Sequence, residues 1–327
     1  YAVAHIFASA AAKGPVFTMR GIRCERTDHA NPLGDNVGCD SVGGETVVCE
    51  DCEFIGKFQH GIRLGWGDNN RITRNRIDGA LNCGIYVGLT GKVAPSYGEY
   101  SNNYINTPYA VNDCFTLHDG TAGGVGNRIV GNVFYSGTEN CIDASASYTG
   151  TYIACNELHG GPLNGTTGSG NALVALIADA TIERNIFYSY NTPSLLFIST
   201  AVDGTIVRSN LLIGSTNKRT LGAFAQIILH NVSDINPQYI GNTFIGRCTE
   251  NPGASMFGFN TQTPTMVFKN NIVVKSAIDT YQLMFWTGFT GPVGSFDNNI
   301  MVVPATGAVQ YCGKTWASFN STFSAHA

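Results

Sequence analysis

The sequence predicts an all-β protein: a right-handed single-stranded parallel β-helix of about eleven coils, with an asparagine ladder and a short N-terminal cap. A motif with a central asparagine recurs about every 28 residues along the 327-residue chain. The segments between the copies are short apolar runs broken by glycine, asparagine or proline, which favours strands over helices. Charged residues make up only 13% of the chain, whereas aromatic residues, at 11%, are numerous enough to fill a core.

The repeat follows the template apolar-x-x-Asn-x-apolar, and it organises the chain from end to end. Nine copies have their central residue at Asn75, Asn103, Asn132, Asn156, Asn185, Asn210, Asn242, Asn270 and Asn299. Two earlier copies keep the apolar frame but carry Arg20 or Cys52 at the centre. The sequence therefore predicts eleven coils.

A second apolar strand lies upstream of most copies. Such strands are found at residues 61–64, 84–87, 114–117, 141–144, 195–198, 226–229, 256–259 and 283–286. Two or three short strands in every repeat, joined by loops of variable length, are typical of a parallel β-helix, in which each coil stacks on the next at a spacing of about 4.8 Å.

The asparagine column has a physical reason. Asparagine tolerates the left-handed conformation that turns often need, and its amide can bond to the same amide one coil above and below. We therefore assign these asparagines to the structure and none of them to catalysis.

Both ends of the β-helix are expected to be capped, because an open coil exposes unpaired strand edges. Val3, Ile6, Phe7 and Ala10 fall at helical spacing, which predicts a short helix over residues 2–12 within a cap at 1–15. The β-helix itself is expected to span 16–301. Residues 302–327 are expected to form the last coil and the C-terminal cap.

The composition of the chain limits the classes of partner that we expect it to bind. The net charge is −4 and the chain has only 19 basic residues, so its charge does not favour binding to nucleic acid. No apolar stretch approaches the length that spans a bilayer. Cys49 and Cys52 have CxxC spacing, but no second pair follows at zinc-site spacing, so we expect no metal there.

Five cysteines fall at recognisable positions of the repeat. Cys114 and Cys141 occupy the same strand position on neighbouring coils, within disulfide range. Cys49, Cys52 and Cys83 are expected to be small buried residues that fill the core.

Candidate functional residues gather on one outer face. Alternate residues of the upstream strands point outward, which places Arg63, Tyr86, Thr116 and Asp143 in one column. A neighbouring column holds Gly65, Gly88, His118 and Ser145, with Trp66, Asp68 and Asp119 at the strand ends. Core packing does not require polar side chains on four consecutive coils, whereas binding or catalysis does.

Each candidate has a chemical interpretation and a plainer one as an ordinary surface residue. His118 with Asp119 suits general acid–base work, and Asp143 with Glu139 suits a hydrolase carboxylate pair. Arg63 could neutralise a uronate carboxylate or an oxyanion. Tyr86 could stack on a sugar or exchange a proton.

The remaining candidates have simpler roles. Trp66, Asp68 and Thr116 are expected to bind substrate. His60 shares the parity of Ile62, so we expect it to point inward. In later coils the corresponding positions are apolar, at Phe197, Ile228, Phe257 and Met284, which suits packing against a loop, a cap or another subunit.

Over residues 16–301 the asparagine-centred repeat resembles the right-handed parallel β-helix, or pectate-lyase-like, superfamily of polysaccharide lyases, glycoside hydrolases, epimerases and phage tailspikes. The chain lacks the paired-Asp, Gly-His-Gly and Arg-Ile-Lys strings of polygalacturonase-like hydrolases and the Trp-Ile-Asp-His string of typical pectate lyases. The resemblance is specific for architecture, and fold does not fix function.

Two classes of function remain open. We favour an extracellular protein that cleaves a polysaccharide held along its outer groove. A lyase would use Tyr86 or His118 as base, with Arg63 or a bound Ca²⁺ withdrawing charge. A hydrolase would use Asp143 with Glu139 or Asp119. The alternative is a non-catalytic structural or adhesive fibre of a virion or cell surface, such as a tailspike-like homotrimer.

Overall fold

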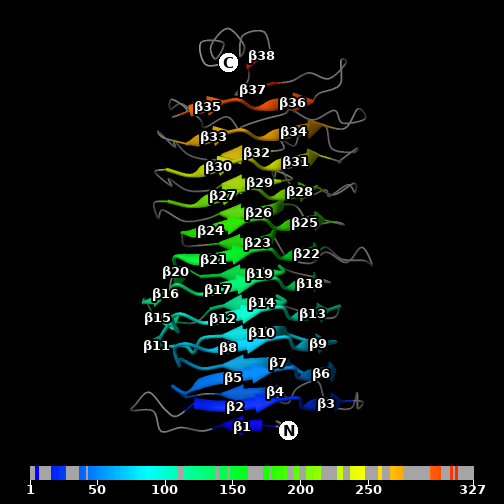
Figure 1. Cartoon of the computed structure of the whole chain (residues 1–327), viewed down its shortest axis with the longest axis vertical. Coiled ribbons are helices and arrows are strands. Elements are labelled where there is room, and N and C mark those ends of the chain that lie inside the picture. Colours follow the sequence, from blue (N-terminus) through cyan, green and yellow to red (C-terminus); the bar gives the residue numbers. More distant parts are fainter. Residues whose placement is uncertain are drawn as a thin grey trace. The chain divides into compact units, whose positions relative to one another are not determined.

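In the computed structural model the described residues form a succession of short strands (Figure 1). These are residues 4–6, 16–26, 37–41, 43–108, 113–118, 120–121, 123–136, 140–145, 148–160, 172–176, 179–189, 194–198, 204–214, 227–230, 236–246, 257–259, 266–275, 295–302, 310–311 and 314–315. Among them every regular element is a strand and none is a helix. Accordingly, no described helix has the length and apolarity needed to cross a lipid bilayer.

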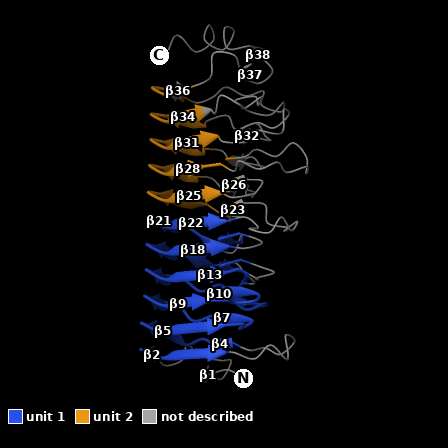
Figure 2. Ribbon diagram, turned by 90° about the vertical axis from the view of Figure 1, so that its right-hand side faces the viewer, with its two compact units in different colours: residues 1–169 blue, residues 170–327 orange. Residues whose placement is uncertain are grey.

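The chain divides into two compact units, residues 1–169 and 170–327 (Figure 2). The first unit has three parallel sheets of six strands each, and the chain visits the sheets in turn. Sheet I contains β1 (Ala4–Ile6), β4 (Val37–Ser41), β7 (His60–Leu64), β10 (Cys83–Val87), β14 (Phe115–Leu117) and β19 (Ile142–Ala144). Sheet II contains β2 (Val16–Arg20), β5 (Thr46–Glu50), β8 (Arg71–Thr73), β12 (Glu99–Ser101), β17 (Arg128–Val130) and β21 (Thr151–Ala154). Sheet III contains β3 (Arg23–Arg26), β6 (Glu53–Gly56), β9 (Arg76–Asp78), β13 (Tyr104–Thr107), β18 (Val133–Ser136) and β22 (Glu157–Gly160).

The second unit follows the same plan: its strands fall into three parallel sets, which the chain again visits in turn and which we label sheets IV, V and VI. Sheet IV contains β23 (Ala172–Leu176), β26 (Ser194–Ile198), β29 (Ile228–His230) and β32 (Phe257–Phe259). Sheet V contains β24 (Ala180–Glu183), β27 (Ile206–Arg208), β30 (Gln238–Ile240), β33 (Val267–Lys269) and β35 (Ser295–Asp297). Sheet VI contains β25 (Ile186–Ser189), β28 (Leu211–Ile213), β31 (Thr243–Gly246), β34 (Ile272–Lys275) and β36 (Ile300–Val302). The predicted right-handed parallel β-helix is therefore confirmed in both units.

Short strand pairs complete the structure. In the first unit β11 (Lys92–Val93) pairs with β15 (Gly120–Thr121), and β16 (Gly124–Val125) pairs with β20 (Tyr148–Thr149). In the second unit β37 (Gln310–Tyr311) and β38 (Lys314–Thr315) form an antiparallel pair within the expected C-terminal cap. The other residues of that cap beyond Val302 lie outside the described residues.

The N-terminal helix prediction is wrong over Ala4–Ile6. These residues form β1, which pairs in parallel with β4 and places Ala4 beside Cys39. An added strand satisfies the backbone groups along one side of β4, which a helix cannot do. The remaining residues of the predicted cap lie outside the described part of the chain.

The asparagine ladder is confirmed, and its chemistry is hydrogen bonding between amides. Asn103 Oδ1 accepts from the backbone N and from Nδ2 of Asn75, both at 3.0 Å. Asn103 Nδ2 donates in turn to Asn132 Oδ1 and to the backbone O of Ile72. The ladder runs through Asn75, Asn103, Asn132 and Asn156 in the first unit, and through Asn185, Asn210, Asn242, Asn271 and Asn299 in the second.

Two details of the ladder prediction are wrong. In the second unit the ladder residue is Asn271, because β33 pairs Phe268 with Tyr239 and so shifts the motif by one residue. Asn270 instead has a φ of 56°. The left-handed position is thus the residue before each ladder asparagine, as Arg74 and Asn102 also show with φ of 55° and 56°.

The earliest repeat is shifted as well. Met19 pairs with Cys49, so Ile22 and not Arg20 stands at the centre of the first copy. Cys52 does occupy a ladder position, because its backbone N donates to Asn75 Oδ1 at 3.0 Å. Hydrogen bonds from the Cys49 thiol and from the backbone of Ile22 and Gly21 lower the pKa of Cys52 to about 6.

Cys114 and Cys141 are neighbouring, fully buried free thiols. Burial, together with a hydrogen bond to Cys114, raises the pKa of Cys141 well above its usual value. Such a thiol is a poor nucleophile, because the thiolate is the reactive form.

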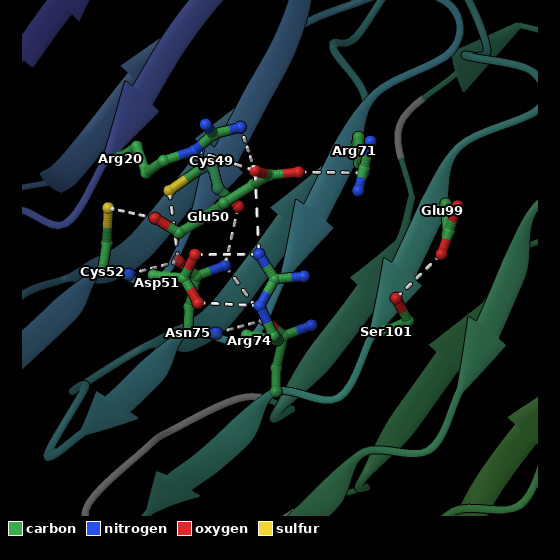
Figure 3. A network of polar contacts seen from close by, with 11 residues as sticks. Arg20, Cys49, Glu50, Asp51, Cys52, Arg71, Arg74, Asn75, Glu99 and Ser101 are labelled. Atoms are coloured by element: carbon green, nitrogen blue, oxygen red, sulfur yellow. Dashed lines mark hydrogen bonds and ion pairs between the residues drawn. The ribbon is translucent and has the colours of Figure 1, made fainter.

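A buried carboxylate joins the first three strands of sheet II (Figure 3). Glu50 is 2% exposed, and the guanidinium groups of Arg20 and Arg71 approach it at 2.5 and 2.9 Å. Arg74 lies 3.7 Å from the same carboxylate and forms a bidentate pair with Asp51 at 2.7 and 2.8 Å. The hydrogen bond from Arg74 holds the pKa of Asp51 below its usual value.

We expect Glu50→Gln to lower the free energy of unfolding by about 1–2 kcal/mol, because three arginines then surround a neutral amide. The side chains of Arg20, Arg71 and Arg74 are 64%, 53% and 47% exposed, which keeps the loss below that of a fully buried pair. Urea denaturation measures it. Glu53→Gln, which breaks the exposed pair with Arg23, serves as the control with an expected change under about 0.5 kcal/mol. Equal losses in the two variants would contradict the assigned role of Glu50.

Candidate functional site

The predicted outward column is a row of side chains in register on sheet I. Arg63 pairs with Tyr86, Tyr86 with Thr116, and Thr116 with Asp143. The structure adds Asp40 at the head of this row, beside Arg63. Three strand steps separate Arg63 from Asp143, about 14 Å at the usual strand spacing. We call Asp40, Arg63, Tyr86, Thr116 and Asp143 the first outer row.

Arg63 is engaged within the row. Its Nε donates to Asp40 Oδ1 at 2.7 Å and its Nη2 donates to Asp40 Oδ2 at 2.8 Å. Asp40 is 1% exposed, so the carboxylate and the guanidinium form a bidentate, partly buried pair. Asp40 thus takes two of the five guanidinium N–H donors, and the expected role of Arg63 as a receptor for a uronate carboxylate stays a prediction.

A second outer row was missed by the sequence reasoning. Counting back two residues from the aligned pairs Ile62, Ile85, Phe115 and Ile142 gives His60, Cys83, Asp113 and Asn140. We call these four residues the second outer row.

His60 faces this row and not the core, which corrects its predicted direction. A Cβ added at Gly61 would lie 2.5 Å from Ile77 Cγ2, so Gly61 faces inward, and Ile62 is also fully buried. Two consecutive inward residues break the alternation, as in a β-bulge. The His60 ring accordingly lies 5.3 Å from the ring of the outward Tyr86.

Asp113 is a second buried carboxylate of the face and is 5% exposed. Its Oδ2 accepts from Thr116 Oγ1 at 3.2 Å and its Oδ1 accepts from the backbone N of Asn140 at 3.0 Å. Cys83 Sγ lies 3.3 Å from the same threonine hydroxyl, and burial raises the pKa of this thiol. Thr116 is 5% exposed, so its hydroxyl positions Asp113 and is poorly placed for the substrate contact that we expected of it.

The strand ends beside the rows are held by backbone contacts. The backbone N of His118 donates to Val87 O, and that of Ser145 donates to Leu117 O. His118 is half-buried, and its carbonyl oxygen accepts from Tyr148 Oη at 3.3 Å. Gly88 has a φ of 123°, and a Cβ there would lie 1.7 Å from His118 O, so only glycine fits.

Trp66 and Asp68 lie at the corner between sheets I and II, beyond the rows. Lys92 Nζ stands 5.8 Å over the Trp66 ring, and a Cβ on Gly44 would meet the same ring at 2.8 Å. Asp68 Oδ1 accepts from the backbone N of Ser96 at 3.0 Å. Both side chains therefore have structural contacts. Asp119 and Glu139, which were also predicted, lie outside the described residues.

The apolar stripe predicted for later coils does not form one outward column. Phe197 aligns with Leu229, whereas Ile228 aligns with Phe257, which is 1% exposed. Met284 lies outside the described residues. Exposed apolar side chains of the second unit stand instead on sheet VI, at Ile186, Ile272, Ile300 and Val302.

The two rows together offer carboxylates, an imidazole and a phenol on five successive strands. Among the described residues no group of three or more metal-ligating side chains is arranged to hold an ion. Comparisons of the chain with protein-family models, with curated proteins and with solved structures find no significant match.

Proposed function

We propose that the outer face of sheet I binds an extracellular polysaccharide along the strand stack and cleaves it. The observation that carries the proposal is the first outer row, which is in register on five successive strands and in which Arg63, Tyr86 and Asp143 are half-buried while Asp40 and Thr116 are buried beneath them. A linear polymer with regular repeats can make equivalent contacts with successive coils of such a stack. The resemblance of the repeat to polysaccharide lyases and hydrolases agrees with this substrate class.

Roles follow from exposure and contacts. Asp143 is half-buried at the end of the row and is the proposed proton donor or acceptor. The predicted Asp119 and Glu139 are the proposed partners of Asp143. Asp113, which is 5% exposed and accepts hydrogen bonds with both oxygens, is assigned to positioning the neighbouring backbone and the Thr116 hydroxyl. Tyr86, held against His60, offers a half-buried ring to a sugar. His118 remains a second candidate for proton transfer.

The test is incubation with a panel of neutral and acidic polysaccharides, reading new reducing ends and ultraviolet-absorbing unsaturated products together. Reducing ends with unsaturated product identify a lyase, and reducing ends alone identify a hydrolase. The same panel with a chelator tests whether Ca²⁺ takes part. Absence of both products across the panel, with folded protein, would contradict the enzymatic proposal.

A second candidate function is a structural or adhesive fibre that self-associates side by side, as a homotrimer for example. The outer face of sheet VI favours it, because Ile186, Ile272 and Ile300 are 43%, 39% and 59% exposed there. Sedimentation equilibrium of the wild type and of Ile272→Lys tests this candidate. A monomer at all concentrations would contradict it.

A further inference from the structure

We propose that Tyr97, at the corner between sheets I and II, is the stacking platform of a second saccharide site, which binds a pyranose ring without reacting with it. The site lies off the two outer rows, so the inference goes beyond the proposed function and does not depend on cleavage. Its basis is an exposed aromatic ring that is held in a strained backbone conformation, with a carboxylate and a guanidinium beside it.

Tyr97 stands in a column of left-handed turn residues that precede the strands of sheet II. Left-handed φ angles of 58°, 56°, 67° and 60° occur at Asn69, Tyr97, Gly126 and Gly150. The column is stacked coil on coil, and the backbone N of Tyr97 donates to Val125 O at 2.8 Å. Asparagine and glycine adopt this conformation readily, whereas a bulky side chain is strained in it. Tyrosine is therefore the exception in the column, and the backbone conformation does not account for it.

The core does not account for the ring either. Tyr97 is 62% exposed, whereas Tyr100, three residues later, is fully buried. A side chain this exposed gains little free energy from removal from water. Residues held in sparsely populated conformations concentrate at functional sites, where the surrounding structure keeps them in place. The exposed and strained ring therefore points to a ligand.

The ring meets Gly126 with one edge. A Cβ added at Gly126 would lie 2.9 Å from Tyr97 Cδ1 and 3.1 Å from Cε1, and the remaining ring atoms would lie beyond 4 Å. A larger residue at position 126 would displace the ring, so glycine is needed there for space as well as for its φ of 67°. Because Gly126 covers only an edge and the residue is 62% exposed, the ring keeps a face on which a ligand can stack.

Polar groups flank the ring on the outer row of sheet II. Two residues beyond the column positions come Glu99, Arg128 and Tyr152, which are paired in register on β12, β17 and β21. Ser101 Oγ donates to one oxygen of the exposed Glu99 at 2.9 Å. The guanidinium of the exposed Arg128 lies 4.5 Å from the centre of the Tyr152 ring, which holds it in place. Two residues of extended chain span about 7 Å, so a sugar stacked on Tyr97 has an acceptor and a donor within reach of its edge.

This set of groups suits a pyranose with equatorial hydroxyls, as in β-linked polymers of glucose or xylose. Such a ring presents axial C–H groups on its faces and hydroxyls around its edge. The C–H face packs on an aromatic ring. The hydroxyls both donate and accept hydrogen bonds, which matches a carboxylate beside a guanidinium.

The experiment is affinity electrophoresis in native gels that contain mixed-linkage β-glucan or xylan. Asp143→Asn is the parent, so that the proposed cleavage does not consume the polysaccharide. The slowing of migration with polysaccharide concentration gives the Kd. We expect Tyr97→Gly to raise the Kd by about fivefold or more, the effect of losing one stacked aromatic ring. Tyr97→Phe keeps the ring and should stay within about twofold of the parent.

The matched control is Asn102→Gly. Asn102 is exposed at the other end of β12 and has the same φ of 56°, so the change removes a side chain from an equivalent conformation away from the site. Its Kd should equal that of the parent. A rise equal to that of Tyr97→Gly would mean that the effect is not specific to the ring, and would overturn the inference.

Tyr97→Gly also tests whether the ring serves folding. Glycine adopts a φ of 56° without strain, and little buried surface is lost with the exposed ring. The variant should therefore unfold at the same urea concentration as the wild type or at a higher one. A midpoint clearly below that of the wild type would assign the ring to the fold and overturn the inference.

The other outcomes separate this inference from the proposed function. Equal retardation of the parent and a folded Tyr97→Gly variant overturns the inference, and so does a loss in Tyr97→Phe as large as in Tyr97→Gly. A parent that neither polysaccharide retards also overturns it. The proposed function is judged by product release from the polysaccharide panel. Its failure leaves retardation that depends on Tyr97 standing, and the failure of this inference leaves cleavage on sheet I standing.

Discussion

Asp143→Asn is expected to lower the rate of glycan cleavage by about a hundredfold to ten-thousandfold, the range that a positioned acid or base contributes. The amide keeps the shape of the side chain and its place beside Thr116 on the first outer row, but it cannot give or take a proton. Binding should survive, so the loss should fall on kcat with little change in KM. Initial rates of reducing-end release, measured against substrate concentration, give both constants.

The matched control is Asp78→Asn. Asp78 is half-buried, like Asp143, but it lies on sheet III, where it pairs with Arg76 at 2.8 Å, and off the two outer rows. Its activity should stay within about twofold of the wild type, since surface changes away from a site have small effects. Cleavage by Asp143→Asn at the wild-type rate would remove Asp143 from the reaction. A loss of equal size in Asp78→Asn would point to general destabilisation.

Asn103→Ala is expected to lower the free energy of unfolding by about 3 kcal/mol or more, because it leaves several buried polar groups without partners. Asn75 loses the acceptor of both its backbone N and its Nδ2, and the backbone O of Ile72 loses its donor. All of these groups are buried, so water cannot replace the lost bonds. Urea denaturation of the wild type and the variant measures the difference.

The preceding residue provides the control. Asn102 is exposed and has a φ of 56°, so Asn102→Gly should change the stability by less than about 0.5 kcal/mol. The pair Asn271→Ala and Asn270→Gly should repeat the contrast in the second unit, where the ladder passes through Asn271. Equal effects at Asn270 and Asn271 would contradict the corrected register.

The architecture could be predicted because the repeat expresses it directly. Each coil must place one amide at the same position for the ladder to form, and this requirement leaves an asparagine about every 28 residues. The register could not be fixed where the motif is ambiguous. Val267 and Phe268 both precede an asparagine by three residues, and only strand pairing decides between Asn270 and Asn271.

The first outer row could also be predicted, because strict alternation holds from Ile62 through Leu64 and in the neighbouring strands. The second outer row could not, since the break at Gly61 depends on the approach of Ile77 from another sheet. The sequence also did not indicate that Asp40 is the partner of Arg63. Asp40 lies 23 residues earlier in a strand that carries no copy of the motif.

The most direct measurement is a crystal structure of Asp143→Asn soaked with the longest oligosaccharide that the wild type cleaves. The account predicts an oligosaccharide lying across β7, β10, β14 and β19, with a sugar ring against Tyr86 and the scissile bond beside residue 143. An oligosaccharide bound on another face, with the outer rows of sheet I bare, would contradict it.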